Sequence, residues 1–355
     1  MYISTGESSR AEARLEVLLN TVSDGVLITD SQLILRSVNP KARILFGFGE
    51  QRLGKLSLLE GTRSIELETL AREALSQNRP VKRDLKLYTS GEQRYFHVTG
   101  SPLGEAEKEA LLVLTEFTRL HKLEQVRKDF AANVSHELRT PIQLIKGFAE
   151  TLLDALPEDP AQLRHYIGII LKNAHSMENL STDLLTLVSL EEGEALPFTM
   201  EETLVYPLLE EAMASAALGA GKKNITLCLN CSEELKAVMY GPFILQGVIN
   251  LLDNGIKYSP AGGTVRLGAE ILGDELVISV ADKGIGIPAK HLSRIFERFY
   301  RVDGSRHRDQ PGTGLGLAIV RHIAEIHQGT ASAESHAGEG SVFRIRIPLA
   351  PRRGA

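Results

Sequence analysis

The chain reads Phe130-Ala131-Ala132-Asn133-Val134-Ser135-His136-Glu137-Leu138-Arg139-Thr140-Pro141 near its centre. At about 100° per helical residue, its apolar residues form a stripe that continues along the chain. The stripe consists of Phe130, Val134, Leu138, Ile142, Ile145, Phe148 and Leu152. His136 lies about 200° from Val134 on the same helix. The pattern therefore predicts a helix with one buried face and a histidine that points away from it.

The neighbours of His136 suggest chemistry rather than simple solvation. Pro141 removes a backbone donor and costs about 3 kcal/mol inside a helix, so it should loosen the turn that carries His136. Glu137 could orient the imidazole or accept the proton that is lost when a ring nitrogen attacks. These residues indicate a nucleophilic histidine.

Helical sequence surrounds this stretch on both sides. A charged helical pattern begins near Glu116 and reaches His136 without a flexible linker, which predicts rigid coupling to the preceding domain. Breakers at residues 156 to 160 separate it from a second helix with apolar residues from Leu163 to Leu187. Such a hairpin needs a partner to close a core. We expect a homodimeric four-helix bundle with His136 outside, and the alternative is a hairpin docked on its own chain.

The N-terminal block, residues 11 to 118, alternates short strand-like runs with turns. Expected strands are residues 26 to 29, 33 to 35, 83 to 89, 94 to 101 and 110 to 117, with a short helix opened by Asn39-Pro40 and closed near Phe46-Gly47. The runs Asp24 to Asp30 and Asn39 to Ala42 resemble a PAS sensory domain.

Three other motifs in the chain have weaker functional interpretations. Residues 49 to 56 match a phosphate loop until Leu56, where a magnesium-holding Ser or Thr is required. His97 alternates with Phe96 and Val98, so it faces outward if they face the core, which disfavours haem ligation. Cys228 and Cys231 have CxxC spacing, but a strand sends them to opposite faces and zinc needs two more ligands. We interpret them as reduced structural cysteines.

The C-terminal block, residues 197 to 350, contains a helix from Phe243 to Tyr258. Four of its residues share one side: Asn250, Asn254, Lys257 and Tyr258. Two carboxamides and an ammonium suit a magnesium-bound triphosphate. Gly255 inside this helix costs about 1 kcal/mol relative to alanine, which suggests close packing or a ligand.

Two glycine-containing segments follow that helix. A strand at residues 276 to 281 leads into Asp282-Lys283-Gly284-Ile285-Gly286, where a carboxylate can accept from an amine such as that of adenine. Later, Gly312-Thr313-Gly314-Leu315-Gly316-Leu317 opens a helix, and backbone N–H groups at such a start bind phosphate. Leu317 stands where a dinucleotide fingerprint needs glycine.

In this order and spacing, the motifs from about residue 126 to 350 resemble those of sensor histidine kinases. The resemblance implies a multidomain α+β chain: a PAS domain at 11–118, a dimerisation and phosphotransfer hairpin at 119–193, and a GHKL-type ATP-binding α/β sandwich at 197–350. With its PAS block and the segment Phe299-Tyr300-Arg301-Val302-Asp303, the chain is similar to phosphate-regulon sensor kinases of the PhoR kind.

The resemblance also implies roles for individual residues. His136 would accept the γ-phosphoryl group of ATP, Glu137 would act as base, and Thr140 would position water for dephosphorylating the partner. Asn254 and Asn250 would bind Mg²⁺. The remaining nucleotide-binding residues would be Lys257, Tyr258, Asp282, Gly284, Gly286, Arg301, Gly312, Thr313, Gly314, Leu315 and Gly316, with residues 300 to 313 forming a lid over ATP. Gly241 and Pro311 depart from the residues that relatives commonly carry.

The resemblance implies phosphotransfer to an aspartate of a separate response regulator, an unidentified PAS ligand or upstream sensor protein, and phosphatase activity. A rival class, the gyrase-like GHKL ATPases, places a water-activating glutamate where this chain has Asn250, and an amide cannot take the proton of water. A degenerate binding scaffold would lack ligands that are present here.

Composition sets the remaining limits. The 355 residues are 43% hydrophobic and 24% charged, which is ordinary for globular domains. A net charge of -5 argues against a general nucleic-acid binder. The chain has no apolar run of about 18 residues and no signal-like N-terminus, so we expect a cytoplasmic protein or a soluble fragment of a membrane-anchored kinase.

Overall fold

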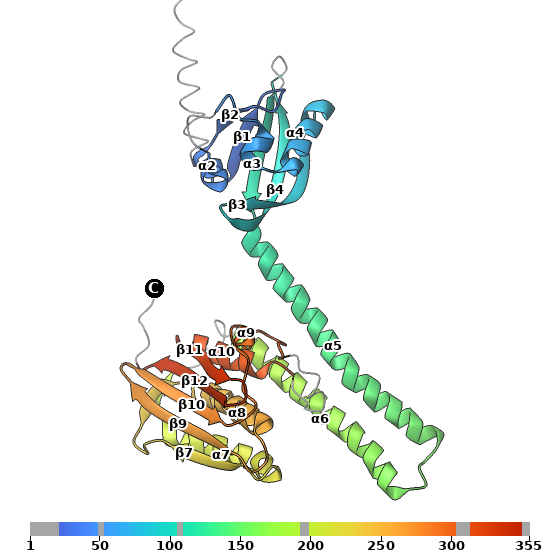
Figure 1. The fold of residues 1–355 in the computed structure, drawn as a ribbon, viewed down its shortest axis with the longest axis vertical. Coiled ribbons are helices and arrows are strands. Elements are labelled where there is room, and N and C mark those ends of the chain that lie inside the picture. The colour runs from blue at the N-terminus through green and yellow to red at the C-terminus, as the bar shows by residue number, and fades with distance from the viewer. Residues whose placement is uncertain (1–20, 49–52, 105–108, 192–198, 303–312, 350–355) are drawn as a thin grey trace, which may run out of the picture. The chain divides into compact units, whose positions relative to one another are not determined.

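The computed structural model describes residues 21–48, 53–104, 109–191, 199–302 and 313–349 (Figure 1). The chain separates into two compact units, residues 1–129 and 130–355. Each unit has a hydrophobic core of its own. Within these ranges, the chain forms no helix that is both long and apolar enough to cross a membrane.

The first unit is built on a five-stranded antiparallel sheet with the order β2-β1-β5-β4-β3. The strands are β1 (Gly25–Thr29), β2 (Leu35–Val38), β3 (Val81–Thr89), β4 (Glu92–Leu103) and β5 (Glu109–Glu116). In β4, Phe96 and Val98 are buried and His97 is exposed, as their alternation predicted. The expected strand at residues 33 to 35 is wrong except for Leu35. Leu33 has a φ of 63°, because the Asp30 carboxylate accepts from the N–H groups that follow it and turns the chain.

Helices α2 (Pro40–Phe46) and α4 (Ile65–Gln77) pack on this sheet, and α3 (Leu58–Thr62) packs against α4. The predicted short helix is confirmed as α2: the Asn39 side chain accepts from the N–H of Ala42, and Gly47 closes the helix with a φ of 71°. Helices α3 and α4 have no counterpart among the expected elements. A capping box between Ser57 and Glu60 is the sequence signal that marks the start of α3.

Two long helices form the hairpin, α5 (Thr118–Asp154) and α6 (Pro160–Glu191). Helix α5 is continuous from the end of β5 past His136, which agrees with the predicted absence of a linker. Pro141 is buried inside the helix and does not end it. Because Pro141 has no N–H, the carbonyl of Glu137 loses its usual helical donor.

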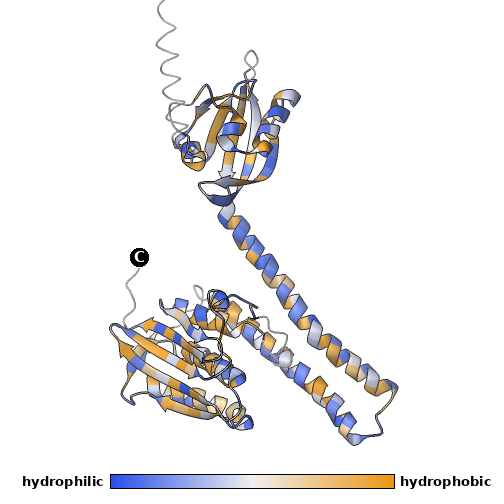
Figure 2. Ribbon diagram, in the orientation of Figure 1, coloured by the Kyte–Doolittle hydropathy of each residue, from blue (hydrophilic) through white to orange (hydrophobic). Residues whose placement is uncertain are grey.

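The C-terminal part of the second unit is a two-layer α/β sandwich. Its sheet has the order β11-β12-β10-β9-β7, with only the β7 and β9 pair parallel. The strands are β7 (Thr226–Asn230), β9 (Thr264–Leu272), β10 (Glu275–Asp282), β11 (Thr330–His336) and β12 (Gly340–Pro348). Apolar residues recur along β9, β10 and β12 (Figure 2), whereas β11 consists of small and polar residues. A smaller sheet pairs β6 (Glu201–Leu204) with β8 (Lys236–Met239).

Helices α7 (Val205–Lys222), α8 (Gly241–Tyr258) and α10 (Gly316–Ile326) pack on the sheet, and α9 (Ala289–Leu292) is a single turn. Helix α8 lies between α7 and α10 and contacts β10, and its apolar face is buried. A Cβ added at Gly255 would lie 3.1 Å from Val265 of β9. Close packing therefore explains the glycine that the sequence placed in this helix.

Candidate functional site

Helix α8 presents the two predicted carboxamides on its half-buried side. The Asn250 side chain donates from Nδ2 to the carbonyl of Gly316 at 3.4 Å and accepts from Nε2 of Gln246 at 3.2 Å. Asn250 therefore joins α8 to the first residue of α10. The side chain of Asn254, one turn further along, has no hydrogen-bond partner among the described residues, so its carboxamide is available to a ligand.

The last residue of β10 supplies the predicted carboxylate. Asp282 is 9% exposed, and its Oδ1 accepts from the N–H of Gly284 at 2.7 Å. Burial raises the pKa of the Asp282 carboxyl, and hydrogen bonds from the N–H groups of Gly284 and Ser341 oppose that rise. The loop passes so close to the end of α8 that a Cβ at Gly284 would lie 2.6 Å from the carbonyl oxygen of Tyr258.

The hairpin between β11 and β12 holds this loop from the other side. Gly286 has a φ of 65°, and a Cβ there would collide with the carbonyl oxygen of His336. The buried hydroxyl of Ser335 accepts from the N–H of Ile287 at 2.8 Å and donates to the carbonyl of Gly340 at 2.7 Å. Sequence reasoning missed Ser335, because its role depends on contacts between distant strands and has no local motif.

The start of α10 brings the third predicted segment to the same place. Thr313 Oγ1 accepts from the N–H of Leu315 at 3.2 Å, and Leu315 is fully buried. Gly314 has a φ of 71°, and its carbonyl accepts from the N–H of Phe299. Gly312 and most of the expected lid lie outside the described residues, and Arg301 is exposed.

The last turn of α8 completes the arrangement. The ammonium of Lys257 lies 4.9 Å from the centre of the Tyr258 ring, and Tyr258 is 36% exposed. We call the residues of α8, the β10 loop and the α10 start the nucleotide group. Its described members are Asn250, Asn254, Lys257, Tyr258, Asp282, Gly284, Gly286, Thr313, Gly314, Leu315 and Gly316. An ammonium, a carboxamide, a buried carboxylate and a helix N-terminus together can bind a polyanion that carries a polar ring.

His136 lies on α5, and both it and Thr140 are exposed, while Glu137 is half-buried. The Thr140 hydroxyl donates to the backbone carbonyl of His136 at 3.4 Å. Within the described part of the chain, the imidazole has no polar side-chain partner, Glu137 included. Consecutive helical residues point about 100° apart, so the side chains of His136 and Glu137 leave the helix in different directions.

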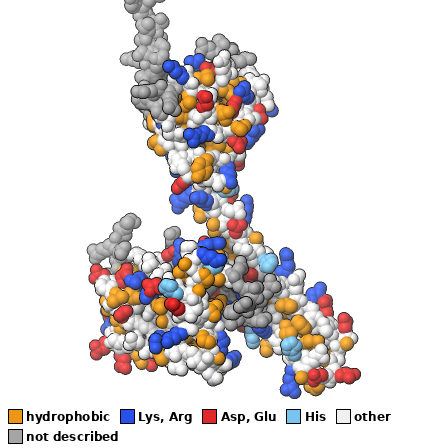
Figure 3. Space-filling model, in the orientation of Figure 1, with side chains coloured by type: hydrophobic (Ala, Val, Ile, Leu, Met, Phe, Trp, Pro, Cys, Tyr) orange, Lys and Arg blue, Asp and Glu red, His pale blue; other side chains and the backbone are white. Residues whose placement is uncertain are grey.

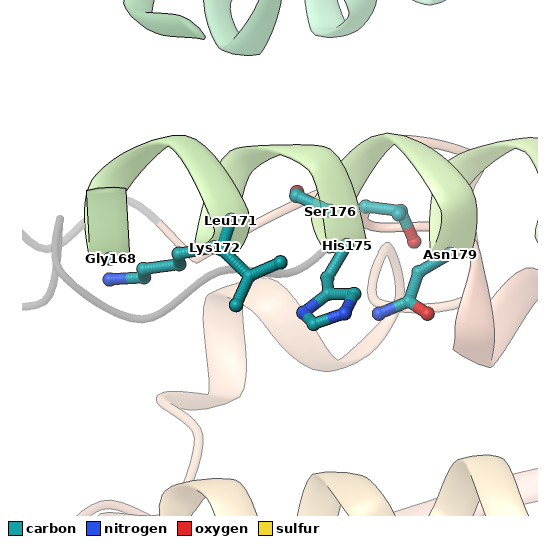
Figure 4. A pocket seen from close by; sticks show the side chains of 7 residues that line it. Gly168, Leu171, Lys172, His175, Ser176 and Asn179 are labelled. Atoms are coloured by element: carbon teal, nitrogen blue, oxygen red, sulfur yellow. The ribbon is translucent and has the colours of Figure 1, made fainter. Parts of the chain in front are cut away.

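Helix α6 packs against the nucleotide-group side of the sandwich. Leu180, Leu187 and Leu190 are buried in the same core as α8 and α10. Nearby, the Thr313 hydroxyl donates to the Asp183 carboxylate at 2.7 Å. A hollow borders this contact, lined by the α6 residues Gly168, Leu171, Lys172, His175, Ser176 and Asn179 together with Thr313 (Figure 4).

Comparison with known families assigns each part of the chain. Residues 13–117 match the PAS fold, residues 126–193 match the His Kinase A (phospho-acceptor) domain, and residues 241–351 match the histidine kinase-, DNA gyrase B- and HSP90-like ATPases. The chain is 34% identical to the phosphate regulon sensor protein PhoR of Pseudomonas aeruginosa over 358 residues, which covers 97% of this chain and 77% of PhoR.

The chain belongs to the sensor histidine kinases. It is therefore a histidine protein kinase of a two-component system, with a domain of the ATP-binding type.

Two further relatives agree with this membership. The chain is 30% identical to the sensor protein SrrB of Staphylococcus aureus over 336 residues. The aligned region covers 93% of this chain and 55% of SrrB. The solved structure of histidine kinase ThkA in complex with response regulator protein TrrA has 25% sequence identity and a TM-score of 0.51, covering 95% of this chain and 98% of ThkA. The predicted family, fold class and kinase activity are confirmed.

Proposed function

We propose that His136 is the phosphoryl acceptor of this kinase and that the nucleotide group binds the ATP donor. The observation that carries the proposal is the convergence of α8, the β10 loop and the α10 start in the same unit as an exposed histidine. Asp282 would accept a hydrogen bond from the adenine amine, beside Tyr258. Lys257 and the N–H groups at the start of α10 would bind the phosphates.

The donor set also fits a magnesium ion that accompanies ATP. Mg²⁺ prefers oxygen ligands and keeps part of its water shell. The Asn254 carboxamide is half-buried and unpaired within the described residues, so its oxygen is available as a ligand. Asn250 already bridges Gln246 and Gly316, so we assign it mainly to holding α10 in place. When bound, the ion would neutralise charge that develops on the phosphates.

In the transfer, a ring nitrogen of His136 forms a bond to the γ-phosphorus, the bond from that phosphorus to the bridging oxygen of ADP breaks, and ADP leaves. Glu137 accepts the proton that the imidazole loses. Hydrolysis by the site itself is disfavoured because Asn250, one turn before Asn254, cannot deprotonate water.

The partner in the second step is a response regulator. Its aspartate would attack the phosphohistidine, so that the phosphorus–nitrogen bond breaks and an acyl phosphate forms. In the opposite reaction, dephosphorylation of the regulator, Thr140 would position a water molecule against that acyl phosphate. The protein would then act as a phosphatase toward its regulator. Thr140 is exposed one turn from His136, where both side chains can reach the same partner.

The hairpin supports a homodimer. Several of its apolar residues remain exposed in one chain, among them Ile142 at 47%, Ile167 at 50% and Leu171 at 55%. Hydrophobic side chains are visible on its surface between charged ones (Figure 3). A second copy would cover this apolar surface and form the four-helix bundle.

Incubation with ATP labelled at the γ-phosphorus tests the proposal. We expect label that is stable to base and lost in acid, as a phosphohistidine requires. His136→Ala should remove it, whereas His165→Ala, at an exposed histidine of α6, should retain it. Acid-stable label, or label that survives His136→Ala, would contradict the assignment.

A further inference from the structure

The ammonium of Lys223 lies against the C-terminal end of α8. Its Nζ donates to three backbone carbonyls, those of Ile256 at 3.0 Å, Lys257 at 2.6 Å and Ser259 at 3.4 Å. Lys223 follows the last residue of α7 and is half-buried. One side chain from another element therefore supplies donors to the end of the helix that carries Asn254, Lys257 and Tyr258.

These carbonyls need such donors because the last turn of a helix has no further N–H groups to pair with them. The end of a helix also carries partial negative charge, which a cation stabilises. The backbone of Lys223 adds a second tie, since its carbonyl accepts from the N–H of Gly262 at 3.0 Å. Lys223 thus fixes both the final turn of α8 and the chain that leaves it.

That turn is in close contact with the β10 loop. A Cβ at Gly284 would meet the Tyr258 carbonyl carbon at 3.0 Å as well as its oxygen at 2.6 Å, so the β10 loop rests directly on the α8 end. Movement of the turn would displace Lys257 and Tyr258 together, and with them the backbone that supports Asp282.

We infer that Lys223 is a positioning residue for ATP binding: it acts through Lys257 and Tyr258 and does not itself touch the nucleotide. The inference rests on the proposed function of the nucleotide group. It extends that function to the residue that directly follows α7, outside the motifs that the sequence singled out.

Titration of the full chain with ATP tests this role, with thermal unfolding measured on each variant. We expect Lys223→Met to weaken ATP binding about tenfold, because the α8 turn loses its donors. Lys223→Arg should recover most of the affinity. Lys222→Met, at the exposed neighbouring lysine, should change it less than about twofold.

A double variant separates positioning from a general loss of stability. If Lys223 acts through Lys257, then Lys223→Met combined with Lys257→Met should bind ATP within about threefold of Lys257→Met alone. An unchanged ATP affinity in Lys223→Met would overturn the inference. It would also be overturned if the loss of affinity in the double variant equalled the product of the losses in the two single variants. If Lys223→Met does not fold, Lys223→Gln takes its place, and an unaltered affinity there counts equally against it. Failure of the unaltered chain to bind ATP would instead contradict the proposed function.

Discussion

The hydroxyl of Thr313 donates a 2.7 Å hydrogen bond to the carboxylate of Asp183, although 130 residues separate them in the chain. The bond joins the start of α10 to α6. Burial raises the pKa of the Asp183 carboxyl, and the bond from Thr313 opposes that rise. In this arrangement, a carboxylate stands beside the helix start to which we assign the phosphates of ATP. Contact between α6 and α10 should therefore oppose ATP binding.

Asp183→Asn tests this opposition. The amide keeps an oxygen for Thr313 and removes the charge, so we expect ATP to bind about fivefold more tightly, equivalent to about 1 kcal/mol of relieved repulsion. Isothermal titration measures the change. Glu178→Gln, which removes an exposed charge on the same helix, should leave the affinity unaltered. Equal or weaker binding by Asp183→Asn would show that the contact does not compete with ATP.

Asp282→Asn should weaken ATP binding about 100-fold. The variant retains an oxygen that can accept from Gly284, but its NH₂ group cannot accept from the adenine amine, and hydrogen bonds to charged groups contribute about 1.5–3 kcal/mol. Asp274→Asn, in the exposed turn before β10, is the control. An ATP affinity of Asp282→Asn within threefold of that of the unaltered chain would show that Asp282 does not bind the nucleotide.

Gly286 and Gly273 have nearly equal φ values, 65° and 64°, but different surroundings. A Cβ at Gly273 has nothing within 4 Å, whereas one at Gly286 meets the backbone at His336. We expect Gly273→Ala to cost about 1–2 kcal/mol of backbone strain. Gly286→Ala should cost clearly more and abolish ATP binding. Urea unfolding and ATP titration of both variants measure this, and similar losses of stability would show that the β11–β12 hairpin does not confine the loop.

The buried His327 predicts how the stability of the second unit depends on pH. Its Nδ1 donates to the carbonyl of Ile323, and its Nε2 accepts from the N–H of Tyr240, so the ring is neutral. Burial lowers the pKa of His327 below its ordinary 6.5. Protonation therefore favours the unfolded chain, and the contribution to stability is complete above pH 6.5 and falls as pH drops below it.

Urea unfolding between pH 8 and pH 5 measures this effect. The free energy of unfolding should lose up to about 1.4 kcal/mol per pH unit below 6.5 through this one group. His327→Gln should remove that part of the slope, while His322→Gln, at a half-buried histidine of α10, the helix that His327 caps, should keep most of it. Identical slopes in the unaltered chain and His327→Gln would contradict the prediction.

Ile142→Lys should dissociate the expected homodimer. Each burial of an isoleucine contributes about 1.5–3 kcal/mol, and a symmetric interface contains the change twice. Light scattering after size exclusion measures the mass. Leu218→Lys, at a residue of α7 that is 74% exposed, should leave the mass unchanged. A dimer that persists in Ile142→Lys would place the interface elsewhere.

Local sequence was sufficient wherever the physical cause is local. Three features could be predicted in this way: the apolar stripe of α5, the Asn39 and Gly47 caps of α2, and the run from Asp282 to Gly286. Helix periodicity, capping and glycine turns act within a few residues. Helices α3 and α4 were also locally signalled, α3 by the capping box of Ser57 and α4 by its N-cap Ser64, but no apolar motif drew attention to them.

The sequence by itself determined the order of the domains, the histidine on its helix and the types of residue that surround a nucleotide. Tertiary structure alone decided which of them meet. Asn250 reaches Gly316, Lys223 reaches the end of α8, and Thr313 reaches Asp183 only after the sheet and helices have packed. These contacts join residues far apart in the chain, and no periodicity or local motif encodes a pairing that depends on how whole elements lie against one another.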